Sequence, residues 1–250
     1  MTRIIAVANQ KGGVGKTTTV LNLGTALRRE GKRVLLVDLD PQAALSVSLK
    51  IPINQAALTI YQVLLGKATA SKALRPTYTG ADLIPANIDL AAAEVELAAV
   101  IGREQVLAEA LQPLSDNYDF ILIDCPPSLG LLTVNALVAA REVLIPLQCE
   151  YLAMRAMSLL LRNIDNVRAR LNPGLAISGI LVTMYNGRTL HAQEVLDEVR
   201  ATFGDKVFSA VVKNSVRFKE APAAGLSILD YAAVHEGAAA YRSLAKELLK

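Results

Sequence analysis

The stretch "IIAVANQKGGVGKTTT", residues 4–19, decides the fold of this chain. It opens with a short apolar run rich in Ile and Val, continues through three glycines, and passes into residues that favour a helix. Glycines let the backbone bend so that successive N–H groups converge, and the start of a helix adds partial positive charge at the same point. A strand, a glycine loop and a helix in this order predict a loop that binds phosphate.

Two lysines in this loop refine the prediction. Lys16 is placed to reach the β- and γ-phosphates of a nucleotide, and the Thr17 hydroxyl is placed to ligate magnesium. Gln10 stands where the usual pattern has its first glycine, and a second lysine, Lys11, follows it. Two ammonium groups about 4 Å apart repel each other by several kcal/mol at an effective dielectric constant near 20. Lys11 is therefore expected to point outward, toward the triphosphate of a second subunit. The residues expected to bind the nucleotide are Gly12, Gly13, Val14, Gly15, Lys16, Thr17 and Thr18.

The rest of the chain alternates apolar, β-rich runs with helical patterns. Strands are expected at residues 3–9, 33–38, 120–125, 142–148 and 177–185, and helices at residues 16–30, 131–140, 153–171 and 191–203. Nearly continuous apolar strands are typical of a parallel sheet that is covered on both faces. The fold class is therefore expected to be α/β, with a doubly wound, mostly parallel sheet flanked by helices. The less regular stretch 52–113 is expected to decorate this sheet.

Composition excludes several classes of protein. The N-terminus becomes polar too soon for a secretory signal, and no apolar run reaches the roughly 18 residues of a transmembrane helix, so we expect a cytoplasmic protein. Two cysteines, Cys125 and Cys149, lie in apolar runs and are expected to be buried free thiols. The net charge is +3, but residues 151–219 carry ten Lys/Arg and five Asp/Glu, which concentrates basic character in the C-terminal half.

Carboxylates close two of the expected strands. "RVLLVDLDPQ", residues 33–42, carries Asp38 and Asp40 on one face of its strand, and "YDFILIDCPPS", residues 118–128, ends its apolar run at Asp124. After a phosphate loop, an acid that closes an apolar strand is expected to hold magnesium through water and to hydrogen-bond Thr17.

These motifs resemble a known family. "KGGVGKTT", residues 11–18, is similar to the deviant Walker A motif of the ParA/MinD ATPases. Longer phrases resemble the chromosomal ParA proteins, also called Soj: "LIPANIDLAAAEVEL" at 83–97, "ILIDCPPSLGLLTVNAL" at 121–137 and "VLIPLQCEYLAMRAM" at 143–157. The resemblance covers essentially the whole chain, and it implies a single P-loop ATPase domain over residues 1–250.

The resemblance also implies roles for particular residues. ATP and Mg²⁺ are the implied cofactors, and the ATP-bound form is implied to be a homodimer in which Lys11 reaches the partner's phosphates. Asp40 is implied to orient the attacking water, and Asp38 to support the switch segment around it. The implied catalytic residues are Lys11, Lys16 and Asp40, and the implied metal-site residues are Thr17, Asp40 and Asp124.

Base recognition is less determined. Asn186, in "LVTMYNGRT" at residues 181–189, has an amide that matches the donor and acceptor edge of adenine, and related proteins place an adenine-contacting Asn about here. The alternative is a turn residue before Gly187. Where relatives have "IPRNVRLSEAPS", this chain has "VVKNSVRFKEAPA", with Lys213, Asn214 and Ser215 in place of Pro-Arg-Asn. That departure leaves open any nucleotide contact of the segment.

ParA proteins bind double-stranded DNA without sequence preference, and the resemblance implies the same here. Arg188 and Arg217 occupy positions where relatives have DNA-contacting arginines, and Lys219 is a third candidate. Looser candidates are Lys213, Arg162, Arg168 and Arg170. A ParB-like centromere-binding protein is the implied partner, and the nucleoid is the implied location. The chain shows neither an N-terminal helix-turn-helix domain nor the basic amphipathic tail with which MinD-type proteins bind membrane, so no membrane partner is expected.

Several functions therefore remain open at the level of sequence. The favoured one is a DNA-segregation switch for a chromosome or plasmid. The same ATPase could instead position a carboxysome, a chemoreceptor cluster or a division site. Two alternatives of other classes are an electron-transfer ATPase with an iron–sulfur cluster on Cys125 and Cys149, and an ATP-dependent biosynthetic ligase.

Overall fold

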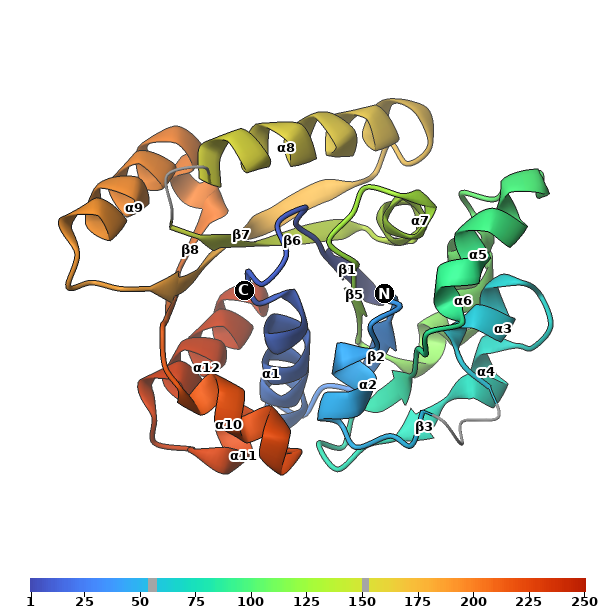
Figure 1. Ribbon diagram of the computed structural model, residues 1–250, viewed down its shortest axis with the longest axis horizontal. Coiled ribbons are helices and arrows are strands. Elements are labelled where there is room, and N and C mark those ends of the chain that lie inside the picture. The colour runs from blue at the N-terminus through green and yellow to red at the C-terminus, as the bar shows by residue number, and fades with distance from the viewer. Residues whose placement is uncertain (54–57, 150–152) are drawn as a thin grey trace.

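The computed structural model describes residues 1–53, 58–149 and 153–250 of the chain, and they are organised around one eight-stranded sheet (Figure 1). The strand order is β3-β4-β2-β5-β1-β6-β7-β8, and every pairing is parallel except that of β3 with β4. The strands are β1 (Arg3–Val7), β2 (Val34–Asp38), β3 (Arg75–Pro76), β4 (Asp82–Ile84), β5 (Phe120–Asp124), β6 (Glu142–Gln148), β7 (Ala176–Tyr185) and β8 (Val207–Lys213). The doubly wound α/β fold expected from the sequence is confirmed.

Helices cover both faces of the sheet and enclose a hydrophobic core on each (Figure 1). On one face lie α3 (Ile60–Leu64), α4 (Ala70–Ala73), α5 (Leu90–Glu96), α6 (Val106–Leu111), α7 (Leu131–Ala139), α8 (Ala153–Arg170) and α9 (Leu190–Phe203). On the other lie α1 (Lys16–Arg29), α2 (Ala44–Ser48), α10 (Arg217–Ala224), α11 (Ile228–Tyr231) and α12 (Glu236–Leu248). Short 3₁₀ helices among the described residues cover Leu97–Ala99, Gln112–Asn117 and Gly204–Lys206. Among the described helices, none is both long and apolar enough to span a bilayer.

The structure adds elements that the sequence patterns missed. Strand β8 alternates buried and more exposed residues at the edge of the sheet, so it lacks the continuous apolar run by which the other strands were recognised. The stretch 52–113 contributes the helices α3 to α6 and two strands. The three-residue strand β4 lies beside β2, and β3 forms the edge of the sheet opposite to β8. This stretch therefore extends the sheet as well as decorating it. Part of the phrase at 143–157 and the start of the basic segment 151–219 lie outside the described residues.

The parallel strands bring their carboxyl ends to one edge of the sheet. At this edge follow the glycine loop after β1, Asp40 after β2, the loop after β5, and the segments that leave β7 and β8. Ligands of doubly wound folds bind at this edge. The fold therefore places the sequence motifs together, although they are far apart in the chain.

Candidate functional site

Glycines allow the backbone conformation of the loop between β1 and α1, and the side chain of Asn9 fixes the loop through hydrogen bonds. Gly13 and Gly15 have φ values of 74° and 88°, a left-handed conformation that favours glycine. Asn9 donates to the backbone oxygen of Pro146 at 2.7 Å and accepts the backbone N–H of Lys11 at 3.0 Å. Helix α1 begins at Lys16, directly after Gly15. The loop is thus preorganised with its N–H groups and a helix N-terminus at one place.

Lys16 and Lys11 have different surroundings in this loop. Lys16 is buried, and its Nζ donates to the backbone oxygen of Lys11 at 3.4 Å. Burial lowers the pKa of Lys16, and the nearby carboxylates of Asp124 and Asp40 oppose that shift. Lys11 is partly exposed, and its Nζ donates to Oε1 of Gln148 at 3.3 Å, at the end of β6. The two ammonium groups therefore have separate partners on the described chain.

Asp124 is the most unusual charged group of the site. It ends β5, it is fully buried, and neither carboxylate oxygen completes a hydrogen bond among the described residues, although the Thr17 hydroxyl lies close enough to favour the carboxylate. Burial raises the pKa of Asp124 well above its usual range, and the negative charge of Asp38 raises it further. A buried carboxylate with unsatisfied oxygens is a site where a cation is favoured.

Asp38 and Asp40 differ in what they contact. Asp38 is fully buried and accepts three hydrogen bonds: from the backbone N–H and the hydroxyl of Ser46, at 2.9 and 2.7 Å, and from the backbone N–H of Asp40, at 3.3 Å. Burial raises its pKa to about 6, against the effect of these hydrogen bonds. Asp40 is partly exposed and accepts the backbone N–H of Gln42 at 2.9 Å. Asp38 thus holds the segment that presents Asp40.

A cavity of 220 Å³, the phosphate cavity, joins the loop to Asp40. Its lining consists of Gly12, Gly13, Gly15, Lys16, Thr17, Thr18, Asp40, Pro127 and Met184. Six of the seven loop residues predicted to bind nucleotide line it, whereas Val14 is buried behind the loop, where its backbone oxygen accepts the Thr183 hydroxyl at 2.8 Å. The cavity combines a buried lysine, a hydroxyl and a carboxylate on one concave surface.

A second cavity of 150 Å³ adjoins the first, and sequence reasoning did not find it. It shares Gly15, Thr18 and Met184 with the phosphate cavity. Its other lining residues are Thr183, Val212, Lys213, Asn214, Ser215, Phe218, Lys219 and Tyr241. They come from the ends of β7 and β8 and from α10 and α12, so only the tertiary fold brings them together. One sequence feature pointed to this region, namely the departure of residues 213–215 from the pattern of relatives.

Asn186 lies outside the linings of both cavities. It is exposed, its side-chain oxygen accepts the backbone N–H of Arg188 at 3.3 Å, and its backbone oxygen accepts the Thr189 hydroxyl at 3.1 Å. These contacts are those of a turn residue before Gly187. In this structure the turn interpretation describes Asn186, and an adenine contact stays a prediction.

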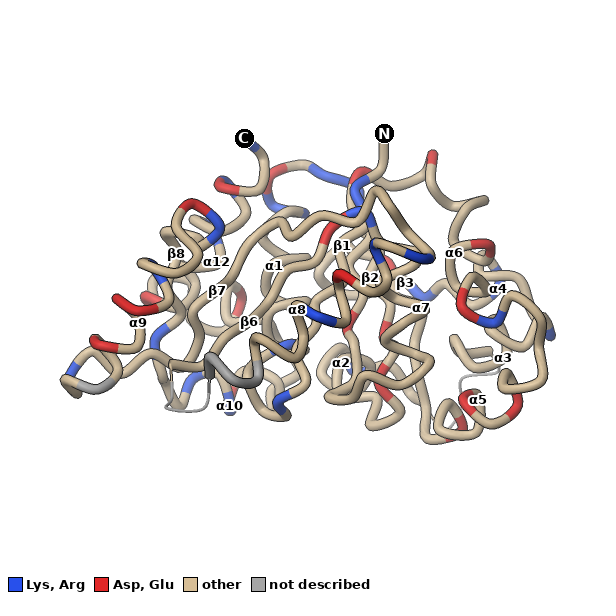
Figure 2. Tube along the Cα trace, turned by 90° about the horizontal axis from the view of Figure 1, so that it is seen from above, with Lys and Arg blue, Asp and Glu red and all other residues tan. Residues whose placement is uncertain are grey.

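The predicted DNA-binding residues follow two adjacent strands. Arg188 comes after β7 and is exposed, whereas Arg217 and Lys219 come after β8, on α10, and are also exposed. Tyr185 and Lys213 pair at the ends of β7 and β8, which puts both segments at the carboxyl edge (Figure 2). The Arg217 guanidinium donates to Glu220 at 2.9 Å and lies over the Tyr231 ring, 6.0 Å from its centroid. Lys219 also lines the second cavity.

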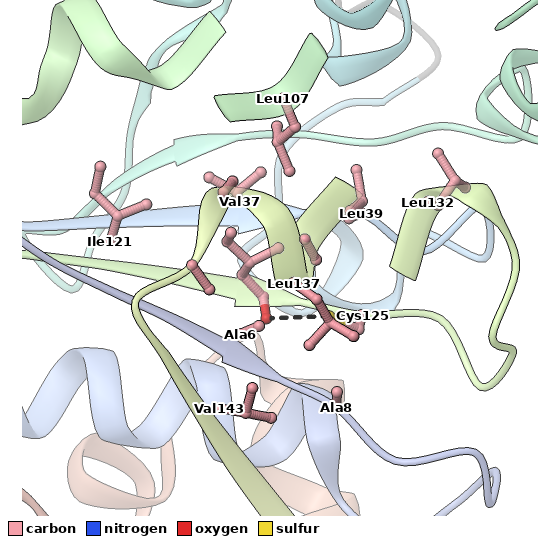
Figure 3. Close-up of a cluster of buried hydrophobic side chains, with 14 of the residues drawn as sticks. Ala6, Ala8, Val37, Leu39, Leu107, Ile121, Cys125, Leu132, Leu137 and Val143 are labelled. Carbon is pink, nitrogen blue, oxygen red and sulfur yellow. Dashed lines mark hydrogen bonds between the residues drawn. The ribbon is translucent and has the colours of Figure 1, made fainter. Parts of the chain in front are cut away.

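The two cysteines belong to the core. Cys125 is fully buried among Ala6, Leu137 and their neighbours, and its thiol points back to the backbone oxygen of Ile123 at 3.9 Å (Figure 3). Burial raises the pKa of Cys125, and it raises that of Cys149 to about 11. Iron–sulfur clusters are held by thiolates, so these surroundings favour inert thiols.

The residues at the phosphate cavity fit a nucleotide and a hard cation. Backbone N–H groups, the α1 N-terminus and Lys16 supply what phosphate oxygens need. Thr17 and the unsatisfied carboxylate of Asp124 supply the oxygen ligands, direct or through water, that Mg²⁺ prefers. The fit rests on the orphaned oxygens of Asp124, whose burial without a cation is unfavourable.

Comparison with known proteins agrees with this geometry. A family model described as an AAA domain matches residues 2–177. The chain is 47% identical to the chromosome partitioning protein ParA of Caulobacter vibrioides, over 99% of this chain and 94% of that protein. It is also 47% identical to the sporulation initiation inhibitor protein Soj of Bacillus subtilis, over 99% of this chain and 98% of that protein.

One solved structure is similar at both levels, sequence and fold. It is named cobyrinic acid a,c-diamide synthase from Mycobacterium smegmatis and contains an ATP analogue and magnesium. It is 44% identical, with a TM-score of 0.88 over 100% of this chain and 95% of that chain. With the phosphate loop, the acids at the carboxyl edge and near-complete coverage by ParA and Soj, this chain belongs to the ParA/Soj family of chromosome-partitioning ATPases.

Proposed function

We propose that this ATPase is a DNA-segregation switch that uses ATP and Mg²⁺. With ATP bound, two copies form a dimer that binds double-stranded DNA without sequence preference, and hydrolysis releases it. A ParB-like centromere-binding protein stimulates hydrolysis and carries the cargo, a chromosome or plasmid. The observation that supports this function is the cavity in which Lys16, Thr17 and Asp40 meet, in a chain with a second loop lysine at position 11.

Each residue of the site has a place in this mechanism. The loop N–H groups and Lys16 bind the phosphates, while Thr17 and Asp124 hold the metal. Mg²⁺ held by these residues would neutralise phosphate charge and so favour transfer to water. Asp40 accepts a proton of the attacking water and orients it, and Asp38 with Ser46 keeps Asp40 in position. Lys11 exchanges its contact with Gln148 for the phosphates of the partner subunit's nucleotide.

Asp40→Ala is expected to separate binding from hydrolysis. The variant keeps the glycine loop, Lys16 and Asp124, so its affinity for ATP should stay within a few-fold of the wild type. Loss of the group that positions the water should lower kcat by at least about a hundredfold. The dimer should then persist on DNA. Phosphate release and DNA retention after ATP removal measure the two effects, and rapid turnover would refute the role of Asp40.

DNA binding tests the proposed function as a whole. The purified protein should retain duplex DNA of unrelated sequences with ATP and Mg²⁺, and lose it with ADP or without nucleotide. If a dimer makes about four phosphate contacts, the logarithm of its affinity should fall with the logarithm of salt concentration with a slope near −3.6, about a hundredfold between 50 and 200 mM. Binding that ignores salt or nucleotide would contradict the switch.

A charge reversal locates the DNA surface within the same experiment. Arg188→Glu should weaken DNA binding and leave ATP hydrolysis in the absence of DNA unchanged, because Arg188 lines neither cavity. Arg141→Glu is the matched control, since Arg141 is exposed at the amino end of β6, on the opposite edge of the sheet. Equal losses in the two variants would remove Arg188 from the DNA-binding surface.

The name of the Mycobacterium smegmatis structure favours a second candidate function, an ATP-dependent ligase that forms amides. Both functions need the phosphate cavity, so nucleotide binding does not separate them. A ligase would consume ATP in proportion to an added carboxylic acid and amine, and it would not need DNA. ATP-dependent DNA binding by the wild type, with turnover independent of such substrates, distinguishes the switch.

A further inference from the structure

The loop from Cys125 to Gly130 connects the metal-site acid to α7. It begins directly after Asp124, and its Pro127 lines the phosphate cavity. A Cβ atom built on Gly12 would lie 3.9 Å from Cβ of Pro127, so this loop lies next to the glycine loop. Thr133, in the first turn of α7, donates from its hydroxyl to the backbone oxygen of Ser128 at 2.6 Å. This hydrogen bond therefore ties the first turn of α7 to Ser128, the residue next to Pro127.

The first turn of α7 has no cap of its own. Its N-cap residue is Gly130, which has no side chain to accept the free N–H groups of the helix. Glu94, on the neighbouring helix α5, supplies the acceptor: the backbone N–H of Leu132 donates to its Oε1 at 3.3 Å. A carboxylate at this place also interacts favourably with the helix dipole.

The missing side chain of Gly130 leaves the space that this carboxylate occupies. Its φ and ψ of −71° and −173° are open to any residue, so the backbone does not require glycine. A Cβ built there would overlap Oε1 of Glu94 and would lie 3.1 Å from Cδ and 3.2 Å from Oε2. A side chain at position 130 would therefore have to displace the Glu94 carboxylate from the backbone that it lies against. Two residues on different elements, Glu94 and Gly130, thus form one contact.

We propose that Glu94 is a positioning residue for ATP hydrolysis. Its carboxylate fixes the first turn of α7, and through it the loop that carries Pro127 to the phosphate cavity. Glu94 touches neither nucleotide nor metal ligand in this role, and it acts only through the loop. This inference rests on the ATPase function proposed above. It means that a residue of α5, a helix outside the phosphate cavity, affects the rate of ATP hydrolysis.

The Glu94→Ala variant is expected to lower kcat for ATP hydrolysis about tenfold, a change of about 1.4 kcal/mol in activation free energy. Affinity for ATP should remain within about twofold, because Lys16 and the glycine loop lie on other elements. Glu94→Gln keeps an acceptor oxygen and should restore part of the rate. Gly130→Ala should reproduce the loss by displacing the carboxylate. The double variant should be no slower than either single variant, since both remove the same contact.

Glu96→Ala is the matched control. Glu96 lies two residues further on α5, accepts the Tyr61 hydroxyl at 2.5 Å and pairs with Lys67 at 3.6 Å, away from α7. It should keep the wild-type kcat. All rates are measured well below each variant's melting temperature, so that a loss of stability alone does not change them. An unchanged kcat in Glu94→Ala, an equal loss in Glu96→Ala, or additive losses in the double variant would overturn the role of Glu94 alone. A wild type without ATPase activity would overturn this inference and the proposed function together.

Discussion

The Lys16→Ala variant is expected to lose nucleotide binding. Lys16 is the buried cation of the phosphate cavity, and no other lysine side chain lines that cavity among the described residues. Its ammonium is kept in surroundings that lower its pKa, and the phosphates of a bound nucleotide are the charges that compensate for that burial. We expect affinity for ATP to fall at least about a hundredfold, or about 2.7 kcal/mol. Calorimetric titration of ATP with Mg²⁺ into the purified variant measures this change.

The second loop lysine provides the control. Lys11→Ala removes the same charge five residues earlier, but Lys11 contacts Gln148 and does not line the phosphate cavity. It should therefore bind ATP nearly as the wild type does and fail to dimerise with a slowly hydrolysed ATP analogue, as seen by light scattering. If Lys16→Ala kept its affinity while Lys11→Ala lost it, the two roles would be reversed. If both variants dimerised, the role of Lys11 across the dimer would be wrong.

The local order of residues explains how much of this site could be predicted. A glycine loop between an apolar strand and a helix has few other structural outcomes, so residues 4–19 predicted the loop, Lys16 and Thr17 at once. Continuous apolar runs likewise predicted β1, β2, β5, β6 and β7 near their observed bounds. Asp124 was predicted from its place at the end of such a run. In each case the information lies within one element and its next turn.

The remainder depends on contacts between distant elements. Strand β8 is an edge strand with alternating burial, and β4 has three residues, so neither carries a strong pattern. The second cavity forms where β7 and β8 end together, and Glu94 meets Gly130 across 36 positions of sequence. The hydrogen bond from Ser46 to Asp38 likewise could not be predicted from the spacing of the two residues in the sequence. Sequence spacing says which elements exist, whereas these groups depend on which elements are neighbours.

The Asp124→Asn variant is expected to stabilise the free protein while it removes metal-dependent function. The pKa of Asp124 is raised by burial, so below the ordinary carboxyl pKa of about 4 the charge is absent and costs nothing. As pH rises from about 4 toward the raised pKa, the unfolded chain ionises this group more easily than the folded protein does, so the stability of the folded state falls. Asparagine avoids this ionisation. At pH 7.5 we expect the free energy of unfolding to increase by about 1–2 kcal/mol, and the gain should vanish toward pH 4.

Addition of Mg²⁺ and ATP should make the wild type more stable than the Asp124→Asn variant. Mg²⁺ and ATP stabilise the wild type by mass action, whereas Asp124→Asn should gain little and hydrolyse ATP at least about a hundredfold more slowly. Asp119→Asn is the matched control, five residues earlier: Arg33 lowers the pKa of Asp119 to about 2, so its charge favours folding above pH 4 and its removal should cost a little stability. Thermal melts of the three proteins with and without Mg²⁺ and ATP measure both effects. If Asp124→Asn melted at a lower temperature than the wild type without ligand, burial of the Asp124 carboxylate without a cation would not destabilise the free protein, and this prediction would be wrong.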